Sequence, residues 1–161
     1  MMFIPDHAFN EEEYIITSTG NIVSRSAVLH KPQSIEIPGG KCIIEKDVII
    51  DGNFAPIKIN RYVLISERTK LIPPSITDGN SVRYIPMTIE KYVTIGSDCI
   101  IESAVIGLGV VIGNNCHISS RSILKDFVLV EDNTIVPPDM VLYFVYIFFD
   151  LDMTYNDIKY F

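Results

Sequence analysis

The feature that most constrains this chain is a six-residue repeat over residues 89–141, which reads IEKYVT, IGSDCI, IESAV, IGLGVV, IGNNCH, ISSRSI, LKDFVL, VEDNTI and VPPDMV. One unit, IESAV, is a residue short. Every first position is aliphatic, namely Ile89, Ile95, Ile101, Ile106, Ile112, Ile118, Leu124, Val130 and Val136. The fifth positions are mostly small or β-branched, namely Val93, Cys99, Val105, Val110, Cys116, Ser122, Val128, Thr134 and Met140. The pattern predicts that both positions face an interior.

A period of six does not fit an α-helix, which repeats every 3.6 residues. Six residues can instead form a short strand and a tight corner. Three such units would close a triangular coil, and successive coils would stack at about 4.8 Å. The stacked aliphatic side chains would then fill the interior, and backbone groups would pair between coils. We interpret the second-position glycines, Gly96, Gly107 and Gly113, as corner residues that need permissive backbone angles.

The same pattern continues upstream less regularly, with leads at Ile44, Ile50, Ile59, Ile65 and Leu71. We therefore predict an all-β fold, a parallel β-helix over residues 35–149 that follows an N-terminal segment, 1–34, leading into the first coil. Residues 77–86 contain turn formers and no clean hexad, which predicts a loop near 74–88 that projects from one corner. An irregular coil of ordinary length is the alternative.

The end of the sequence departs from the repeat. Apolar residues at 151, 155 and 158 follow Asp150 with helical spacing, which predicts a short amphipathic helix over 150–161. This helix would cap the open end of the solenoid. The preceding run, MVLYFVYIFF at 140–149, is too short to span a bilayer as a helix, so we predict no transmembrane segment.

Composition excludes some functions. The formal net charge is -7 and no basic run occurs, so we predict no nucleic-acid binding. The three cysteines, Cys42, Cys99 and Cys116, form no CxxC pair, which favours a reducing, cytoplasmic location. Cys99 and Cys116 are 17 residues apart, so we expect them on the same face of adjacent coils as core residues.

Two enzyme classes use hexapeptide-repeat scaffolds, and the sequence can be compared with each. The γ-class carbonic anhydrases hold zinc with three histidines, and the matching positions here carry Ser97, Glu102 and, one coil earlier, Ile72. Because an activated zinc-bound water needs about three protein ligands, we predict no metal and no cofactor.

Acyltransferases on this scaffold usually place a histidine base on a projecting loop, and residues 77–86 contain none. The histidines are His7, His30 and His117, and the last is expected at a solvated corner. No local cluster supplies the oriented partner that a general base needs, so we predict no catalytic residue. A divergent carbonic-anhydrase-like enzyme or an acyltransferase remains the alternative function.

The segment from Glu13 to Arg25, EYIITSTGNIVSR, together with the repeats behind it, resembles the dynactin subunit 5 family. The resemblance covers about residues 11–142. It includes the IIDGN turn at 49–53, Pro73–Pro74, the short repeat, LKD at 124–126, DNT at 132–134 and PPD at 137–139. The order of these features, more than the hexads, is specific. Likeness to hexapeptide-repeat proteins also implies a left-handed coil.

The family resemblance implies a non-enzymatic subunit of the dynactin pointed-end complex, associated with the cytoskeleton, that docks adaptors and cargo for dynein-driven transport on microtubules. Its implied partners are subunit 6, subunit 4, an actin-related protein and dynein adaptors; in isolation the scaffold could form a homo-oligomer, including a trimer. The apolar strip at 142–149 should be covered by the terminal helix or by a partner. Candidate partner contacts are Arg83, Tyr84, Ile85, Tyr143, Phe144, Tyr146 and Phe148.

Overall fold

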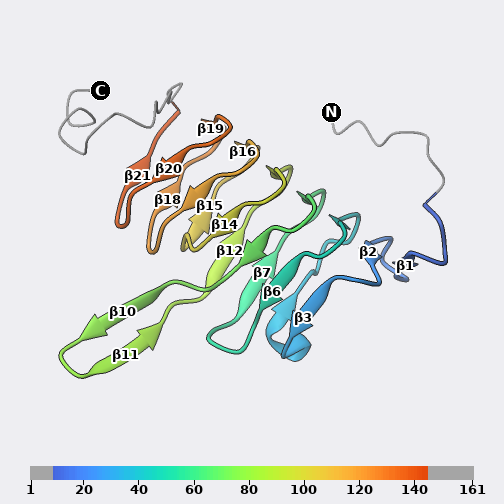
Figure 1. The fold of residues 1–161 in the computed structure, drawn as a ribbon, viewed down its shortest axis with the longest axis horizontal. Helices are drawn as coiled ribbons and strands as arrows, with labels where there is room; N and C mark the ends of the chain where they lie inside the picture. The colour runs from blue at the N-terminus through green and yellow to red at the C-terminus, as the bar shows by residue number, and fades with distance from the viewer. Residues whose placement is uncertain (1–8, 145–161) are drawn as a thin grey trace.

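The computed structural model describes residues 9–144, and they form a solenoid of very short strands (Figure 1). Three sheets make its sides. Sheet A contains β1 (Tyr14–Ile16), β2 (Ile22–Ser24), β5 (Ile43–Ile44), β8 (Leu64–Ile65), β13 (Thr94–Ile95), β16 (Val111–Ile112) and β19 (Leu129–Val130). Sheet B contains β3 (Val28–His30), β6 (Ile49–Asp51), β9 (Lys70–Leu71), β14 (Ile100–Ile101), β17 (His117–Ile118) and β20 (Ile135–Val136). Sheet C contains β4 (Ile35–Glu36), β7 (Ile57–Ile59), β12 (Met87–Ile89), β15 (Val105–Ile106), β18 (Ile123–Leu124) and β21 (Val141–Leu142).

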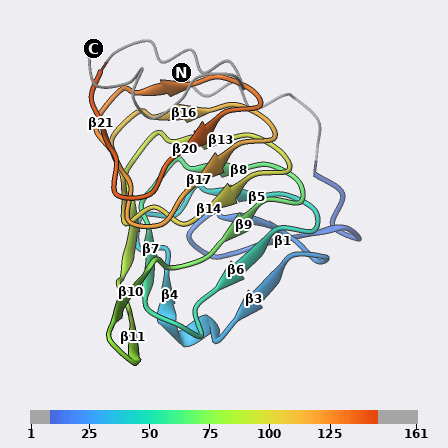
Figure 2. The same ribbon diagram turned by 60° about the vertical axis from the view of Figure 1, so that its left-hand side comes forward.

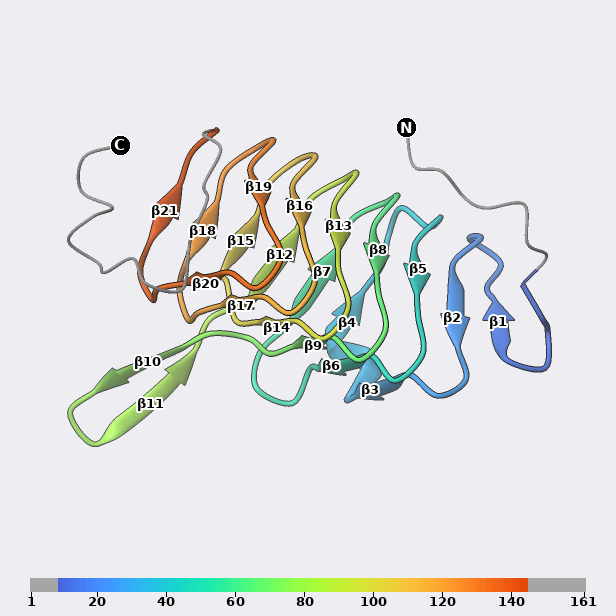
Figure 3. The same cartoon turned by 45° about the horizontal axis from the view of Figure 1, so that its top comes forward.

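From β2 onward the chain visits sheets A, B and C in turn, and six coils result (Figure 2). Each strand pairs in parallel with the strand one coil away, as Thr94 does with Val111 and Ile100 with His117. Figure 3 shows the sheet A strands side by side along the stack. The parallel solenoid that the hexads predict is thereby confirmed. A single 3₁₀ turn, Pro32–Ser34, interrupts the first coil.

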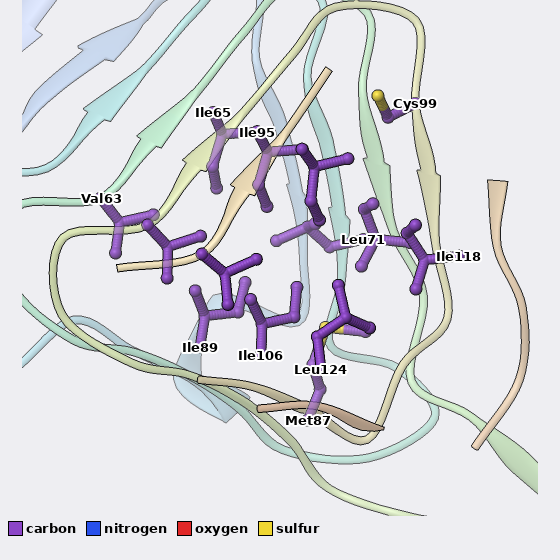
Figure 4. Packing of buried hydrophobic residues seen from close by; sticks show 14 of the residues in the cluster. Val63, Ile65, Leu71, Met87, Ile89, Ile95, Cys99, Ile106, Ile118 and Leu124 are labelled. Atoms are coloured by element: carbon purple, nitrogen blue, oxygen red, sulfur yellow. The ribbon is translucent and has the colours of Figure 1, made fainter. Parts of the chain in front are cut away.

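The lead aliphatic side chains fill the interior, as predicted (Figure 4). In a two-residue strand one side chain points out and the next points in, so the lead residue of each hexad is buried. Burial of each large aliphatic side chain contributes roughly 1.5–3 kcal/mol. All the leads from the second coil onward are at most 3% exposed, namely Ile44, Ile50, Ile59, Ile65, Leu71, Ile89, Ile95, Ile101, Ile106, Ile112, Ile118, Leu124, Val130, Val136 and Leu142.

Most corners have a left-handed backbone residue at the fourth hexad position, where φ is near +60°. For a non-glycine residue this conformation costs about 1–2 kcal/mol of steric free energy. In this conformation the N–H of the fourth residue donates a hydrogen bond to the carbonyl of the third residue of the hexad directly below it in the preceding coil. Asn115 N bonds to Ser97 O at 2.8 Å in this way, and Phe127 N to Leu108 O at 2.7 Å. Residues with this φ include Lys41, Asp47, Tyr62, Arg68, Tyr92, Asp98, Asn115, Arg121, Phe127, Asn133 and Asp139.

Our interpretation of the second-position glycines was wrong, because none of the three has a positive φ. Each glycine instead leaves room for the next coil. A Cβ on Gly113 would collide with Asp132, whose Oδ1 accepts a hydrogen bond from Asn114 N at 2.7 Å. At Gly107 a Cβ would lie 2.6 Å from Asp126 Oδ1, and at Gly96 it would lie 2.5 Å from the Gly113 backbone.

Two other expectations need correction. Val105 is 36% exposed, because the short unit shifts the register and buries Ser103 in place of the fifth residue. The Ser103 hydroxyl has no hydrogen-bond partner among the described residues. The first coil also begins at Ile22, where β2 pairs in parallel with β5, so the predicted boundary at residue 35 falls inside that coil.

The predicted projection is present, but it is a β-hairpin and not a loop (Figure 1). Strand β10 (Ser75–Asp78) pairs antiparallel with β11 (Ser81–Tyr84), and Gly79 at the tip has φ +58°. At the N-terminal end, β1 pairs antiparallel with β2 and covers the edge of sheet A. The predicted helix at 150–161 lies outside the described residues. The described part of the chain holds no helix with the length and apolar character that a membrane crossing requires.

Replacing Gly113 with alanine should destabilise the fold by about 1–3 kcal/mol, because the new methyl group overpacks the contact with Asp132. Glu131→Ala is a matched control, since Glu131 holds the same hexad position one coil later and is exposed. Chemical denaturation of both variants measures the difference. Equal midpoints for the two variants would contradict the role that we assign to the glycine.

Candidate functional site

The predicted contact residues lie at two different corners. Arg83 and Tyr84 belong to β11, and Ile85 follows it, at the corner between sheets B and C. Tyr143 and Phe144 follow β21, at the corner between sheets C and A, and are 64% and 72% exposed. The structure therefore does not bring the two groups together. Tyr146 and Phe148 lie outside the described residues.

The hairpin is attached to the solenoid by side chains from two coils. The Tyr84 ring stacks on Phe54 with centroids 4.6 Å apart. The Arg121 guanidinium donates to Ser75 O at 2.5 Å and to both carboxylate oxygens of Asp139. This hydrogen bonding to Arg121 lowers the pKa of the Asp139 carboxyl. The outer hairpin residues are exposed, so the structure presents a supported two-stranded ribbon.

A second surface was missed by the sequence analysis. We call it the aromatic corner, and it consists of Tyr62, Tyr92, Gly109 and Phe127 at the fourth hexad position between sheets C and A. The Tyr62 and Tyr92 rings are stacked, with centroids 5.1 Å apart and an interplanar angle of 12°. The Arg61 guanidinium carbon lies 4.8 Å from the centroid of the Tyr62 ring. A search for aromatic residues at one hexad position would have found this surface.

Two neighbouring hollows follow this corner. The first, of about 540 Å³, is lined by Tyr62, Tyr92, Thr94, Leu108, Gly109, Val111 and Phe127. The second, of about 730 Å³, is lined by Glu90, Lys91, Val105, Gly107, Leu108, Leu124, Lys125, Asp126, Tyr143 and Phe144. Leu108 lines both hollows, so they adjoin each other at this corner.

The positions that correspond to the zinc-binding histidines hold no histidine. Ser97 lies at a corner, where its N–H donates to Asn114 Oδ1 at 2.8 Å, and Ile72 is aliphatic. Glu102 Oε2 lies 2.7 Å from Nε2 of His117, and the two side chains are 30% and 41% exposed. His117 belongs to β17, so its predicted place at a corner was wrong, as was the expectation that it has no partner. Residues 9–144 contain no cluster of three potential metal-ligating His, Cys, Asp or Glu side chains.

The cysteines are core residues, as predicted, and all three are free thiols. Cys99 and Cys116 lie in neighbouring coils, just before the paired residues Ile100 and His117. Each thiol contacts a backbone carbonyl of the next coil, with Cys99 Sγ 3.1 Å from Gly113 O. The neighbouring Cys99 thiol and burial raise the pKa of Cys116, and burial raises that of Cys42. The hydrogen bond with Cys116 lowers the pKa of Cys99 to about 7. All three thiols are at most 2% exposed, however, and this burial makes them poor candidates for nucleophiles.

The family model described as dynactin subunit 5 matches residues 2–155. The chain belongs to the dynactin subunit 5 family. A relative named dynactin subunit 5, from Dictyostelium discoideum, is 44% identical over 99 residues, which are 62% of this chain and 50% of the relative. This chain therefore spans about half the length of the curated relative that it matches.

Solved structures with this fold include bacterial transferases. The N-acyltransferase AntD from Bacillus cereus, in complex with dTDP and 3-hydroxybutyryl-CoA, has a TM-score of 0.53 at 22% identity, over 68% of this chain and 73% of that one. A hexapeptide transferase family protein from Anaplasma phagocytophilum has a TM-score of 0.50 at 17% identity, over 74% and 69%. These likenesses show the fold, a left-handed parallel β-helix, for this member of the dynactin subunit 5 family.

The Phe54–Tyr84 stack should hold the hairpin in place. An aromatic pair of this kind contributes about 0.5–1.5 kcal/mol beyond its buried area. We expect Phe54→Ala to raise amide exchange across residues 75–84 roughly two- to tenfold, measured by hydrogen–deuterium exchange mass spectrometry. Tyr62→Ala, which removes a stack at the other corner, is the control. Unchanged hairpin exchange in Phe54→Ala would show that the stack does not support the hairpin.

Proposed function

We propose that this chain is a non-enzymatic structural subunit of the dynactin pointed-end complex, on which adaptors and cargo dock during dynein-driven transport on microtubules. Family membership over residues 2–155 is the observation that carries this proposal. By the same resemblance its neighbours would be subunit 6, subunit 4 and an actin-related protein, and its location would be the cytoplasm, in association with the cytoskeleton.

The structure supports a scaffold role through its rigidity. The six coils share one continuous core, and most corners are hydrogen-bonded to the coil before them. A solenoid built in this way presents extended surfaces that keep their shape on binding. The supported hairpin and the aromatic corner give it two separate candidate surfaces, of which the first includes Arg83 and Tyr84.

Enzymatic function is the second candidate, favoured by the Glu102–His117 pair and the likeness to acyltransferases. A histidine with an oriented carboxylate can act as a general base. Neither side chain, however, lines the two hollows described above. The likeness to the transferases is below 25% identity and concerns the fold alone. The pair is better explained as a cross-coil contact between β17 and the corner that follows β14.

Purification of the full-length tagged chain from its native cells tests the proposal. We expect other dynactin subunits and an actin-related protein to co-purify in fixed ratio, with no stoichiometric metal. A Gly113→Ala chain, with its weakened solenoid, should recover less of these subunits than a Glu131→Ala chain expressed at the same level. Recovery of the wild-type chain without any dynactin subunit would refute the assignment, and stoichiometric zinc bound by His117 would favour an enzyme.

A further inference from the structure

We propose that the outer edge of β11 accepts an extended strand from a partner protein, which pairs antiparallel with Ser81–Tyr84 and carries a carboxylate between two apolar residues. This contact turns the projecting hairpin into a three-stranded sheet. The inference rests on the proposed docking role, because it names the way in which one partner docks.

The register of the hairpin determines which of its backbone groups face outward. Hydrogen-bonded and non-hydrogen-bonded pairs alternate along an antiparallel ladder. Ile85 N donates to Pro74 O at 2.8 Å, so these two residues form a hydrogen-bonded pair and the next pair, Ser75 with Tyr84, is not hydrogen-bonded. The N–H and C=O groups of Ser75 and Tyr84 therefore point away from the opposite strand. The same alternation applies two residues further along each strand.

The two outer edges of the hairpin differ. On β10 the solenoid occupies the edge, because Ser75 N donates to Ser120 Oγ at 3.3 Å and Ser75 O accepts a hydrogen bond from Arg121 Nη1. On β11 the outward N–H and C=O groups belong to Val82 and Tyr84, and none of them is hydrogen-bonded to another residue within 9–144. The edge of β11 therefore offers two donors and two acceptors in extended backbone, which is what an added strand pairs with.

This edge is both accessible and fixed in place. All four residues of β11 are exposed, and the hairpin projects away from the solenoid (Figures 1 and 3). The stack of Tyr84 on Phe54 and the hydrogen bonds of Arg121 to Ser75 hold its base. A preorganised edge loses little conformational entropy when a strand binds. A third strand in turn stabilises a two-stranded ribbon, which is marginal by itself.

The side chains of β11 define the chemistry of the partner strand. Arg83 forms no ion pair among residues 9–144, and the only other charged residue of the hairpin is Asp78, beside its tip. Opposite charges and pairs of β-branched or aromatic residues are the favourable neighbours across an antiparallel ladder. A carboxylate therefore fits opposite Arg83, and apolar side chains fit opposite Val82 and Tyr84. Because this chain has a net charge of -7, Arg83 is also a local positive point that sets the register of an acidic strand.

A short labelled peptide in which valine alternates with glutamate tests this contact by fluorescence anisotropy with the purified full-length chain. Val82→Pro removes one outward N–H and leaves the ladder with β10 in place, since an edge strand tolerates proline where its N–H faces solvent. We expect this variant to bind the peptide about tenfold more weakly than the wild-type chain. Thr77→Pro makes the same change directly opposite, on the edge of β10, and should bind normally. Absence of binding to the wild-type chain, or equal affinity in Val82→Pro, would overturn the proposal.

Hydrogen–deuterium exchange checks that both proline variants keep the hairpin. The amides of Ile76 and Arg83 are hydrogen-bonded within the ladder and should exchange as slowly as in the wild-type chain.

Methylation of the peptide backbone tests the pairing without altering the chain. In the antiparallel arrangement the valines lie opposite Val82 and Tyr84 with their N–H groups toward β11, whereas the glutamate N–H groups point away. Methylating the valine amides should abolish binding, and methylating the glutamate amides should change the affinity by no more than about twofold. The opposite pattern, or equal binding of both methylated peptides, is incompatible with the proposed pairing.

A charge exchange tests the carboxylate. Arg83→Glu should weaken binding of the glutamate peptide about threefold and strengthen binding of a lysine peptide by a similar factor. No effect of the exchange would refute recognition of an acidic strand. Dimers of the wild-type chain that disappear in Val82→Pro, measured by analytical ultracentrifugation, would assign the edge to a second copy and would refute a partner strand. These assays contain only the chain and the peptide, so their failure is distinguishable from failure of dynactin subunits to co-purify.

Discussion

Parallel pairing between successive coils is the interaction on which the rest of this structure depends. It joins each strand residue to the residue at the same hexad position one coil away. A side chain in one coil therefore lies directly beside the side chain at the same hexad position in the next coil. A polar side chain at a lead position would lie between two aliphatic neighbours, without a hydrogen-bond partner. The same register produces the side-chain ladders at the corners. Asn115 meets Asn133 with an amide hydrogen bond of 2.8 Å, and Tyr62 meets Tyr92.

The repeat could be predicted from the sequence because the interior accepts few residue types. Ile95, Ile112 and Val130 identify a buried column by themselves. The reason for Gly113 could not be predicted in the same way, since it depends on where Asp132 of the next coil places its carboxylate. The sequence suggested that Gly113 is needed for its backbone angles, whereas the structure shows that it is needed because a larger side chain would collide with Asp132 of the next coil.

The hairpin and the aromatic corner show a second limit. Turn formers around Gly79 indicated an insertion in the repeat. The alternation of polar and apolar residues in β10 and β11 is too weak to distinguish a paired hairpin from a loop by sequence. The hairpin and the short repeat make the spacing of Tyr62, Tyr92 and Phe127 along the chain irregular, and only their shared fourth position in the hexad shows that they lie at one corner. In the N-terminal region Ile22 begins the first coil without a clean hexad, which is why its start was placed too late.

The central proposal is that this chain acts by binding and not by catalysis, and the Glu102–His117 pair is the place to test it. Cells that lack the endogenous protein can be complemented with a Glu102→Gln, His117→Gln chain, and transport along microtubules can be measured. The account predicts the same incorporation into dynactin and the same transport as with the wild-type chain. Normal folding and incorporation with transport lost would contradict it and would identify the pair as functional.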